Sequence, residues 1–378
     1  MTGSKSRRPI LRTIWTMVIT AVCLSAAGAG KQVFSPPTLK EVRSAMGIPS
    51  TSDERGQKDA VGYASTAAQM AEVWRLSVGN PPPIELGTVP KKGIVGVVCP
   101  HDDYVYAGRV YRRILPAITA KRVVVLGVFH GWRRFGARDR LIFDDYAKWR
   151  SPDGPVEVSA LREELLKGLP AGEAFVSDAA HDQEHSVEAI VFWLKHMNPE
   201  VEIVPILVPT MGFDRMKKLA GNLAIVMNKA AKAHGWKIGK DVQVVVSSDA
   251  VHYGPDFDYT PFGKGGVEAY EKAFAQDLSL INGPMSGVVT DAKVRELFSR
   301  LCDPSDPARY RITWCGRFSV PFGLLFMRRL APVRGVPVAY ATSVGWPELK
   351  VKGKLPGKTA PDSLYHFVGY PAVAFELR

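Results

Sequence analysis

Four short runs of apolar residues, rich in β-branched side chains, stand out along the chain at residues 93–99, 122–128, 202–208 and 242–247. Runs of this length without polar alternation are typical of strands buried on both faces of a sheet. They predict the central strands of a parallel or mixed sheet. Residues 365–377 predict one or two further strands that close the fold.

Segments with helical periodicity separate these runs. Residues 66–78, 161–169 and 215–234 each predict a helix, and a further stripe at i, i+3, i+4 and i+7 consists of Val187, Ile190, Val191 and Leu194. Strands that alternate with helices favour an α/β fold. We therefore predict one α/β domain over residues 62–378, with a central mixed, largely parallel sheet flanked by helices.

Composition narrows the class of protein. Of the 378 residues, 46% are hydrophobic and 23% are charged, which excludes a disordered, collagenous or coiled-coil chain. The net charge is +12, but no block of five or more like charges occurs. We therefore expect no nucleic-acid partner. The oligomeric state is left open.

The N-terminal 29 residues have the layout of a secretory signal. A basic start is followed by an apolar stretch over residues 14–27 and by small residues near Ala29. The stretch is shorter than the roughly 20 residues of a membrane span, so we expect no stable span after cleavage; an uncleaved anchor is the alternative. Arg7-Arg8 resembles a twin-arginine signal. We predict an extracytoplasmic protein, periplasmic or secreted, in which residues 30–61 form a linker.

The cysteines do not indicate a disulfide framework. Cys23 lies in the predicted signal, which leaves Cys99, Cys302 and Cys315. An odd number without a CxxC pair argues against both a stapled scaffold and a structural zinc site.

Three histidines follow the ends of predicted buried strands: His101, His130 and His252. In open α/β sheets, ligands bind beyond the carboxyl ends of the strands, where residues distant in sequence meet. His185 lies at the start of a predicted helix, at the same edge. One such histidine would usually be a hydrogen-bonded loop residue, but three at equivalent places favour a shared metal site.

Several segments resemble, in order, motifs of the Memo-like family, whose bacterial members are called AmmeMemoRadiSam system protein B. The resemblance covers roughly residues 62–377 and implies a fold similar to that of the class III extradiol dioxygenases. The segments are residues 100–108 (PHAGYxYSG), 126–130 (LGPSH), 182–188 (DxEHSxE), 203–208 (IxPxLV), 247–254 (SSDFCHWG) and 315–317 (CGR).

The resemblance implies roles for particular residues. His101 and His130 match the histidines that bind iron or copper, and His185 matches an acid/base histidine. Asp182 matches an acidic neighbour of the metal. We expect Asp182 or Glu184 to orient His185.

The chain also departs from the family pattern. The resemblance places a third, cysteine ligand at position 251, where this chain has valine. Aspartates at 102 and 103 replace Ala-Gly, and Phe129 replaces serine. Either the site is rebuilt or the metal is lost and a polar pocket remains. The candidates for the missing donor are Asp102, Asp103, Asp249 and His252.

The function that follows is metal-dependent redox or dioxygenase-like chemistry on an unknown small substrate. Two histidines and one carboxylate are the ligands of non-haem Fe(II) oxygenases, so we expect Fe(II), with copper or zinc as alternatives. Two other functions remain open: a non-catalytic ligand- or peptide-binding protein with a degenerate metal site, and a metal-dependent hydrolase.

Overall fold

The computed structural model describes residues 50–378 apart from 52, 80–81 and 352–356. The chain divides into Met1–Val42 and Arg43–Arg378, and every described residue belongs to the second unit. The predicted signal peptide lies outside the described residues. Within the described part, no helix combines the length and the apolar character needed to cross a membrane.

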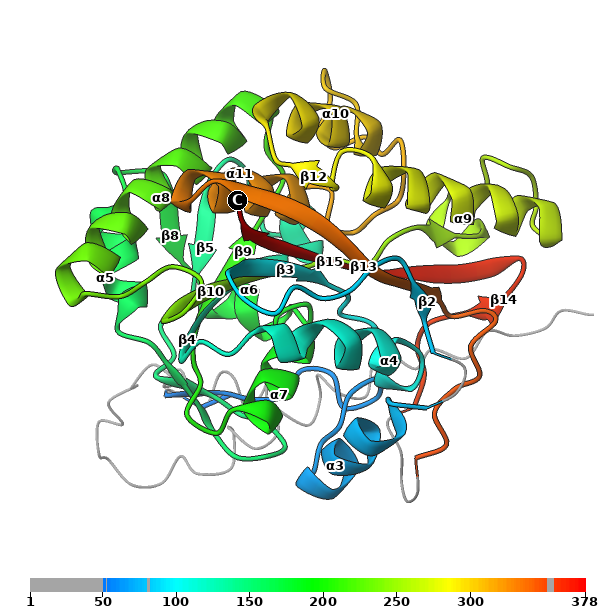
Figure 1. Cartoon of the computed structure of the whole chain (residues 1–378), viewed down its shortest axis with the longest axis horizontal. Coiled ribbons are helices and arrows are strands. Elements are labelled where there is room, and N and C mark those ends of the chain that lie inside the picture. The colour runs from blue at the N-terminus through cyan, green and yellow to red at the C-terminus, as the bar shows by residue number, and fades with distance from the viewer. Residues whose placement is uncertain (1–49, 52, 80–81, 352–356) are drawn as a thin grey trace, which may run out of the picture. The chain divides into compact units, whose positions relative to one another are not determined.

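A mixed sheet of 15 strands forms the centre of the described unit (Figure 1). The four predicted runs are its central strands, and three of them have the predicted bounds. The strands are β1 (Glu54–Arg55), β2 (Ile84–Glu85), β3 (Ile94–Cys99), β4 (Arg122–Val128), β5 (Leu141–Phe143), β6 (Lys148–Trp149), β7 (Val156–Val158), β8 (Ala174–Val176), β9 (Glu202–Val208), β10 (Val242–Ser247), β11 (His252–Tyr253), β12 (Gly287–Val288), β13 (Val333–Thr342), β14 (Asp362–Ser363) and β15 (His366–Leu377).

The order of the central strands is β9-β4-β10-β3, all parallel, and β15 then pairs antiparallel with β3. Because β10 comes last of the four in sequence but lies between β3 and β4, the ends of these three strands are neighbours. All six residues of β3 and of β10 are buried, as the apolar runs predict. The predicted α/β fold with a mixed, largely parallel sheet is confirmed.

The helices include all four that the periodicity predicts, each within a few residues of its expected bounds. They are α3 (Ala67–Leu76), α4 (Tyr104–Ile114), α5 (Leu161–Gly168), α6 (Asp178–Asp182), α7 (Glu188–Met197), α8 (Phe213–His234), α9 (Val267–Asn282), α10 (Asp291–Leu301) and α11 (Ser319–Leu330), with the 3₁₀ turns η1 (Leu115–Ala117), η2 (His130–Arg133) and η3 (Pro255–Phe257).

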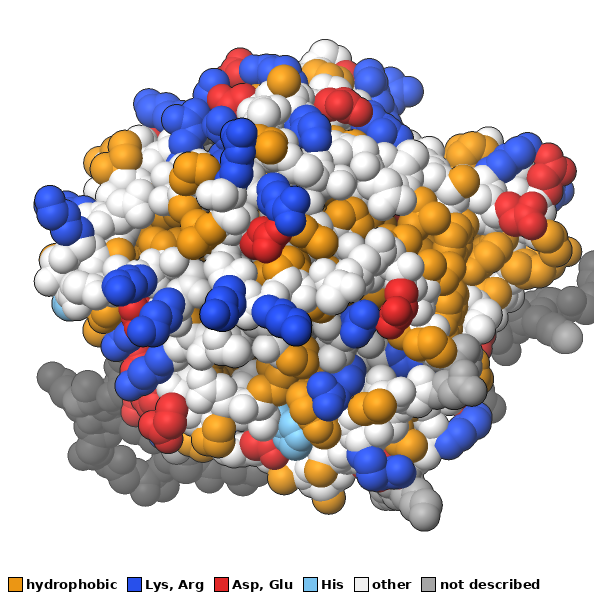
Figure 2. Space-filling model, viewed as in Figure 1, with side chains coloured by type: hydrophobic (Ala, Val, Ile, Leu, Met, Phe, Trp, Pro, Cys, Tyr) orange, Lys and Arg blue, Asp and Glu red, His pale blue; other side chains and the backbone are white. Residues whose placement is uncertain are grey.

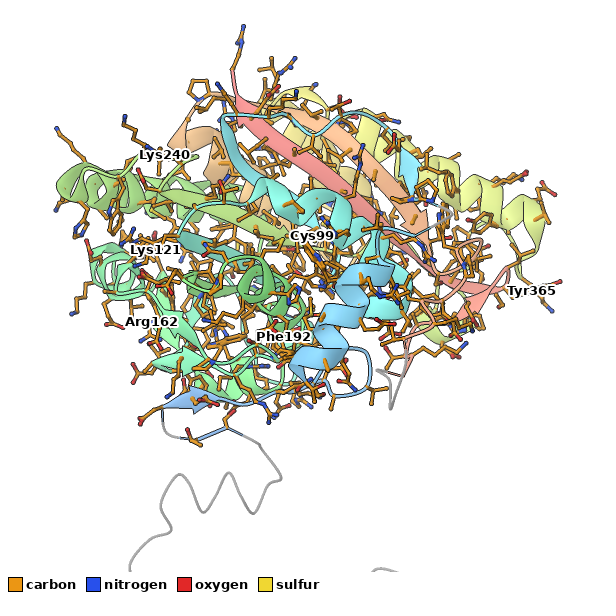
Figure 3. The ribbon with its side chains drawn as sticks, turned by 60° about the horizontal axis from the view of Figure 1, so that its bottom comes forward. Cys99, Lys121, Arg162, Phe192, Lys240 and Tyr365 are labelled. Carbon is orange, nitrogen blue, oxygen red and sulfur yellow. The ribbon has the colours of Figure 1, made fainter. Side chains whose placement is uncertain are left out.

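The helices cover both faces of the sheet (Figure 1). One apolar core contains residues of α5, α8, α10 and α11, and the other contains residues of α3, α4 and α7. Figure 3 shows Lys121 and Lys240, which precede β4 and β10, on one side of the fold, and Cys99, the last residue of β3, near its centre. The carboxyl ends of the strands therefore lie inside the described unit.

The described end of the predicted linker takes part in this fold. Strand β1 pairs with β6, and Arg55 is 1% exposed. Its guanidinium forms an ion pair with Glu188, at the start of α7. The proposed boundaries at residues 29 and 61 stay a prediction.

Candidate metal centre

Loops at the carboxyl ends of neighbouring strands bring the candidate residues together. His101 follows β3, His130 follows β4 and Asp249 follows β10. His185 lies just before α7. The ring centroids of His101 and His130 are 5.4 Å apart, those of His101 and His185 5.5 Å, and those of His130 and His185 5.0 Å. The structure thus gathers three of the four predicted histidines around one point.

His101 is the central member of the cluster and is 1% exposed. Its Nε2 lies 3.2 Å from Asp249 Oδ2 and 3.5 Å from Cys315 Sγ. Two sets of potential ligand atoms share this ring, each with all atoms within 4.8 Å of one another: His101 with His130 and His185, and His101 with Asp249 and Cys315. Oxygen and sulfur donors therefore lie beside Nε2 of His101, and His101 also belongs to a group of three imidazoles.

Ser247 determines which nitrogen of His101 faces the cluster. Its hydroxyl donates to the Ser186 carbonyl at 2.7 Å, so its oxygen accepts a bond from Nδ1–H of His101, also at 2.7 Å. The lone pair of the neutral ring is then on Nε2, which faces the Asp249 carboxyl and the Cys315 thiol. Imidazole, carboxylate and thiolate are all metal ligands once the carboxyl and the thiol lose their protons, so the donor set fits a metal.

Glu184 contacts the other two histidines, His130 and His185. This carboxylate is 1% exposed and accepts bonds from His130 N at 2.8 Å and His130 Nδ1 at 2.9 Å. It also accepts the His185 and Ser186 backbone N–H groups, each at 2.9 Å. The bond to Nδ1 leaves His130 Nε2 for a ligand.

The charges of the metal-free site follow from burial and from this carboxylate. Burial lowers the pKa of His101 well below its usual value and lowers that of His185 to about 4. Burial also lowers the pKa of His130, but Glu184 more than offsets this, so the pKa is raised. Burial opposes ionisation of Glu184, yet His130 holds its pKa well below the ordinary value. The site therefore contains an ionised Glu184, neutral imidazoles at His101 and His185, and a His130 whose protonated form Glu184 favours, so that metal binding would release a proton from His130.

Asp249 and Cys315 hold their protons more tightly in the absence of metal. Burial raises the pKa of Asp249 to about 7 against the opposing bond from His101 N–H. Burial, followed by the charge of Asp249, raises the pKa of the Cys315 thiol well above its usual value. A cation would favour ionisation of both groups.

Cys315 is a potential donor that the sequence analysis did not include among the candidates for the ligand missing at position 251. Val251 is fully buried in a small apolar cluster with Tyr253 and Phe367. The sulfur instead comes from Cys315, just before α11, and accepts a bond from Asp249 N at 3.1 Å. The resemblance covers residues 315–317 but implies no role for them. An unpaired cysteine in a family motif was the signal that could have identified this candidate ligand.

Asp103 and Asp182 do not join the cluster. The Asp103 carboxylate accepts the Ala360 N–H at 2.8 Å and the Thr359 hydroxyl at 2.9 Å, so it anchors a neighbouring loop. Asp182 accepts bonds from Ser50 Oγ at 2.6 Å and from a tyrosine hydroxyl on the loop after β5. Neither carboxylate is among the groups close enough to share an ion with the histidines.

A cavity of about 370 Å³ opens in front of the cluster. His252 lines it, with its Nδ1 3.0 Å from the Ala250 carbonyl, and burial lowers its pKa to about 4. The other lining residues are His101, Asp102, His130, His185, Asp249, Phe257, Tyr310, Thr313, Cys315, Thr359, Ala360, Pro361 and Val368. The volume suits a small organic molecule.

The fold and the cluster together define an α/β protein with a candidate metal centre at the carboxyl edge of its sheet. Residues 62–349 match the Memo-like protein family, and the chain belongs to that family. It is 28% identical to a MEMO1 family protein of Thermococcus kodakarensis, over 66% of this chain and 80% of the relative. It is 28% identical to one of Aquifex aeolicus, over 68% and 82%, and 26% identical to one of Nitrosopumilus maritimus, over 75% and 85%.

Proposed function

We propose that this protein binds Fe(II) at His101, His130 and Asp249 and carries out dioxygenase-like redox chemistry on a small chelating substrate. The observation that carries the proposal is the convergence of Asp249 Oδ2 and Cys315 Sγ on the lone-pair nitrogen of the buried His101. Two imidazoles and a carboxylate are a donor set that Fe(II) oxygenases use. A thiolate also suits copper or zinc, so the metal itself must be measured.

The substrate would enter the cavity in front of the cluster. A bound metal ion would lower the pKa of a chelating hydroxyl. His185 is the proton acceptor in this proposal, because its imidazole is neutral and its side chain is 36% exposed toward the opening. Glu184 orients His130 and His185, whereas Asp182 has no direct role. Dioxygenase cleavage of an aromatic ring breaks one carbon–carbon bond of the substrate, places both atoms of O₂ in the product and needs no external reductant.

Metal analysis and oxygen uptake test this function. We expect about one iron per chain after anaerobic reconstitution with Fe(II), and oxygen consumption with catechols. The double variant His101→Ala/His130→Ala should bind no metal at this site. If wild-type protein binds no iron, copper or zinc, the chain is a non-catalytic binding protein; metal without oxygen uptake would leave hydrolysis as the activity to assay.

The contribution of Cys315 to metal binding can be tested with a second buried cysteine, Cys302, as the matched control. Cys315→Ser should weaken Co(II) binding by about tenfold or more and remove the sulfur-to-cobalt charge-transfer absorption. Cys302→Ser should change neither, because Cys302 is buried elsewhere, with its sulfur 3.4 Å from the Phe298 carbonyl. An unchanged spectrum in the Cys315 variant would exclude sulfur ligation.

We also propose that the mature chain is extracytoplasmic and exported by the twin-arginine route. The basic and apolar pattern of residues 1–29 supports this location. Cell fractionation with the Arg7→Lys/Arg8→Lys variant tests it, since the paired arginines should be required for export. Full-length wild-type chain confined to the cytoplasm would refute the proposal.

A further inference from the structure

A second cavity, of about 480 Å³, lies at the other end of β3 from the candidate metal centre. Ile94, the first residue of that strand, lines this cavity, whereas Cys99, the last residue, leads to His101. At about 3.3 Å per residue, roughly 16 Å separates the two ends of the strand. The two cavities have no lining residue in common, so the second is separate from the candidate metal centre.

The described lining of this second cavity is positively charged. Lys91, Lys92, Arg112 and Arg113 line it, and neither Asp nor Glu does, so we call it the basic cavity. The chain as a whole has a net charge of +12, and Figure 2 shows Lys and Arg side chains spread across the face in view. A hollow lined by four cations and no carboxylate concentrates anions beyond the effect of the net charge.

Two glutamates near the basic cavity are paired with arginines. Glu85 Oε1 lies 3.1 Å from Arg113 Nη2, but the two side chains are 60% and 35% exposed, so a multivalent anion can compete with this pair. Glu376 lies in an adjoining hollow that shares both lysines with the basic cavity, and it pairs with Arg334 at 2.6 Å. Neither glutamate therefore neutralises the lysines.

Two further carboxylates belong to segments beside the basic cavity. The Asp241 carboxylate accepts the Lys237 N–H at 2.7 Å, and the exposed Lys240 lies next to it in the chain. The terminal carboxylate belongs to Arg378, an exposed residue whose N–H donates to the Pro332 carbonyl at 3.0 Å. Even if Glu85 and the terminal carboxylate are both set against the four cations, the basic cavity keeps an excess of positive charge.

Gln243, a buried polar residue of β10, joins the walls of the basic cavity and is 1% exposed. Its Nε2 donates to the Ile94 carbonyl at 2.8 Å. Its Oε1 accepts the N–H groups of Thr119 at 2.7 Å and Ala120 at 2.8 Å. These bonds connect the starts of β3 and β10 to the loop after η1. The walls are thus ordered before a ligand binds, which lowers the entropic cost of binding.

The cationic side chains extend from a fixed backbone. Gly93, which follows Lys92, has a φ of +72°, and its carbonyl accepts the Leu377 N–H at 2.8 Å. The Arg112 guanidinium lies 3.7 Å from the centre of the Trp74 ring. The Nε atoms of Arg112 and of the next arginine are buried and have no hydrogen-bond partner among the described residues. An anion in the cavity would supply acceptors to these guanidinium groups.

We propose that the basic cavity binds a phosphate ester, whose phosphate pairs with Lys91, Lys92 and Arg112. A phosphate carries more than one negative charge, and its oxygens match both the guanidinium fork and the lysine ammonium groups. Val89 and Pro116, in the same lining, provide apolar surface for the organic part of the ester. This inference goes beyond the proposed function, because the basic cavity needs no metal and shares no residue with the candidate metal centre.

Calorimetric titration of the metal-free full chain with inorganic pyrophosphate tests this site. At low ionic strength, Lys91→Gln/Lys92→Gln should weaken pyrophosphate binding by at least about tenfold. The matched control is Lys229→Gln/Lys232→Gln, which removes the same charge at two exposed positions of α8 that line neither cavity. That control should change the affinity by less than about twofold, because distant surface charges are screened.

The outcome for this site is independent of the outcome for the metal. His101→Ala/His130→Ala should lose metal binding and keep the wild-type affinity for pyrophosphate. Arg112→Gln should weaken pyrophosphate binding, and if that variant does not fold, the exposed lysine pair still gives the comparison. The proposal is overturned if wild-type protein does not bind pyrophosphate, or if the two double lysine variants lose affinity equally.

Sedimentation with lipid vesicles identifies the source of the phosphate. Phosphatidate presents a phosphate monoester on a lipid, and phosphatidylcholine vesicles are the control. Sedimentation with phosphatidate that Lys91→Gln/Lys92→Gln abolishes and Lys229→Gln/Lys232→Gln retains would support the basic cavity and assign its phosphate to a lipid headgroup. Pyrophosphate binding without such sedimentation would support it with a soluble ester as the ligand.

Discussion

Replacing Arg55 with methionine tests whether residues that precede the matched family region hold the metal centre in place. Arg55 and Glu188 form an ion pair with side chains 1% and 0% exposed. The Arg55 guanidinium also donates to the carbonyls of His181 at 3.0 Å and Glu184 at 2.6 Å, and it lies 4.4 Å from the centre of the Trp149 ring. Methionine fills similar space but leaves Glu188 as an unpaired buried charge.

The free-energy cost can be bounded from the titration of Glu188. Burial raises the pKa of this carboxyl while Arg55 opposes the rise. Without Arg55, Glu188 can remain in the fold by taking up a proton, and pH 7 lies 7 − 4.5 = 2.5 units above its usual value of 4.5. At 1.36 kcal/mol per unit this costs about 3.4 kcal/mol, within the 3–5 kcal/mol typical of a broken buried pair.

The cost should depend on pH in a defined direction. In the variant, the folded pKa of Glu188 is raised, so the stability from the protonated form is fully present below about pH 4.5 and is lost as the pH rises. At pH 5 the protonation cost falls to about 0.7 kcal/mol. Urea unfolding followed by tryptophan fluorescence at pH 5, 6 and 7 measures this trend.

A second substitution provides the control. Arg55→Met/Glu188→Gln removes both charges and should recover much of the stability lost at pH 7, with little dependence on pH between 5 and 7. Metal affinity should fall in Arg55→Met, because the bond to the Glu184 carbonyl is lost. A loss below 1 kcal/mol at pH 7, or one that does not change with pH, would refute this account of the pair.

Three further substitutions test other parts of the structure. Burial raises the pKa of Asp277 to about 6 from 3.8. The protonated form therefore stabilises the fold fully below pH 3.8, and about 2.2 × 1.36 ≈ 3 kcal/mol of stability is lost as the pH rises through 6. Asp277→Asn should remove this pH dependence, as measured by urea unfolding at pH 4–8. Gly316→Ala should destabilise the protein by about 1–3 kcal/mol in thermal unfolding, since its Cβ would overlap the Ser248 side chain, whereas Gly221→Ala meets nothing within 4 Å and should not destabilise it. Glu184→Gln should weaken metal binding by about 10- to 100-fold in a chelator competition assay, and an unchanged affinity would contradict its orienting role.

The central strands could be predicted from sequence because their signal is local. β4, β9 and β10 begin and end at the residues where the apolar runs begin and end, and β3 differs by one residue. Burial on both faces requires apolar side chains at every position, so the pattern itself defines the strand. The convergence of His101 and His130 follows from the same pattern, since it requires only that the strand ends share one edge, whereas His185 reaches this edge from the loop before α7.

The contacts of Arg55 could not be predicted in this way. The segment is polar and contains no apolar periodicity, which is the pattern of an exposed linker. Its burial depends on one charge partner 133 residues away, at the start of α7, and on backbone carbonyls of the loop before that helix. Local polarity carries no information about a partner at that separation.

The placement of Cys315 could not be predicted from local sequence either, because it depends on how α11 packs against β10. Ser319 Oγ, at the start of α11, donates to the Ser247 carbonyl at 2.8 Å, and Asp249 N donates to the Cys315 sulfur at 3.1 Å. Two contacts thus join the end of β10 to the segment that leads into α11. Since His101 lies beside the same strand end, that junction places the thiol next to its imidazole. A valine at position 251 is therefore compatible with a complete donor set, because the sulfur reaches the site from a different element.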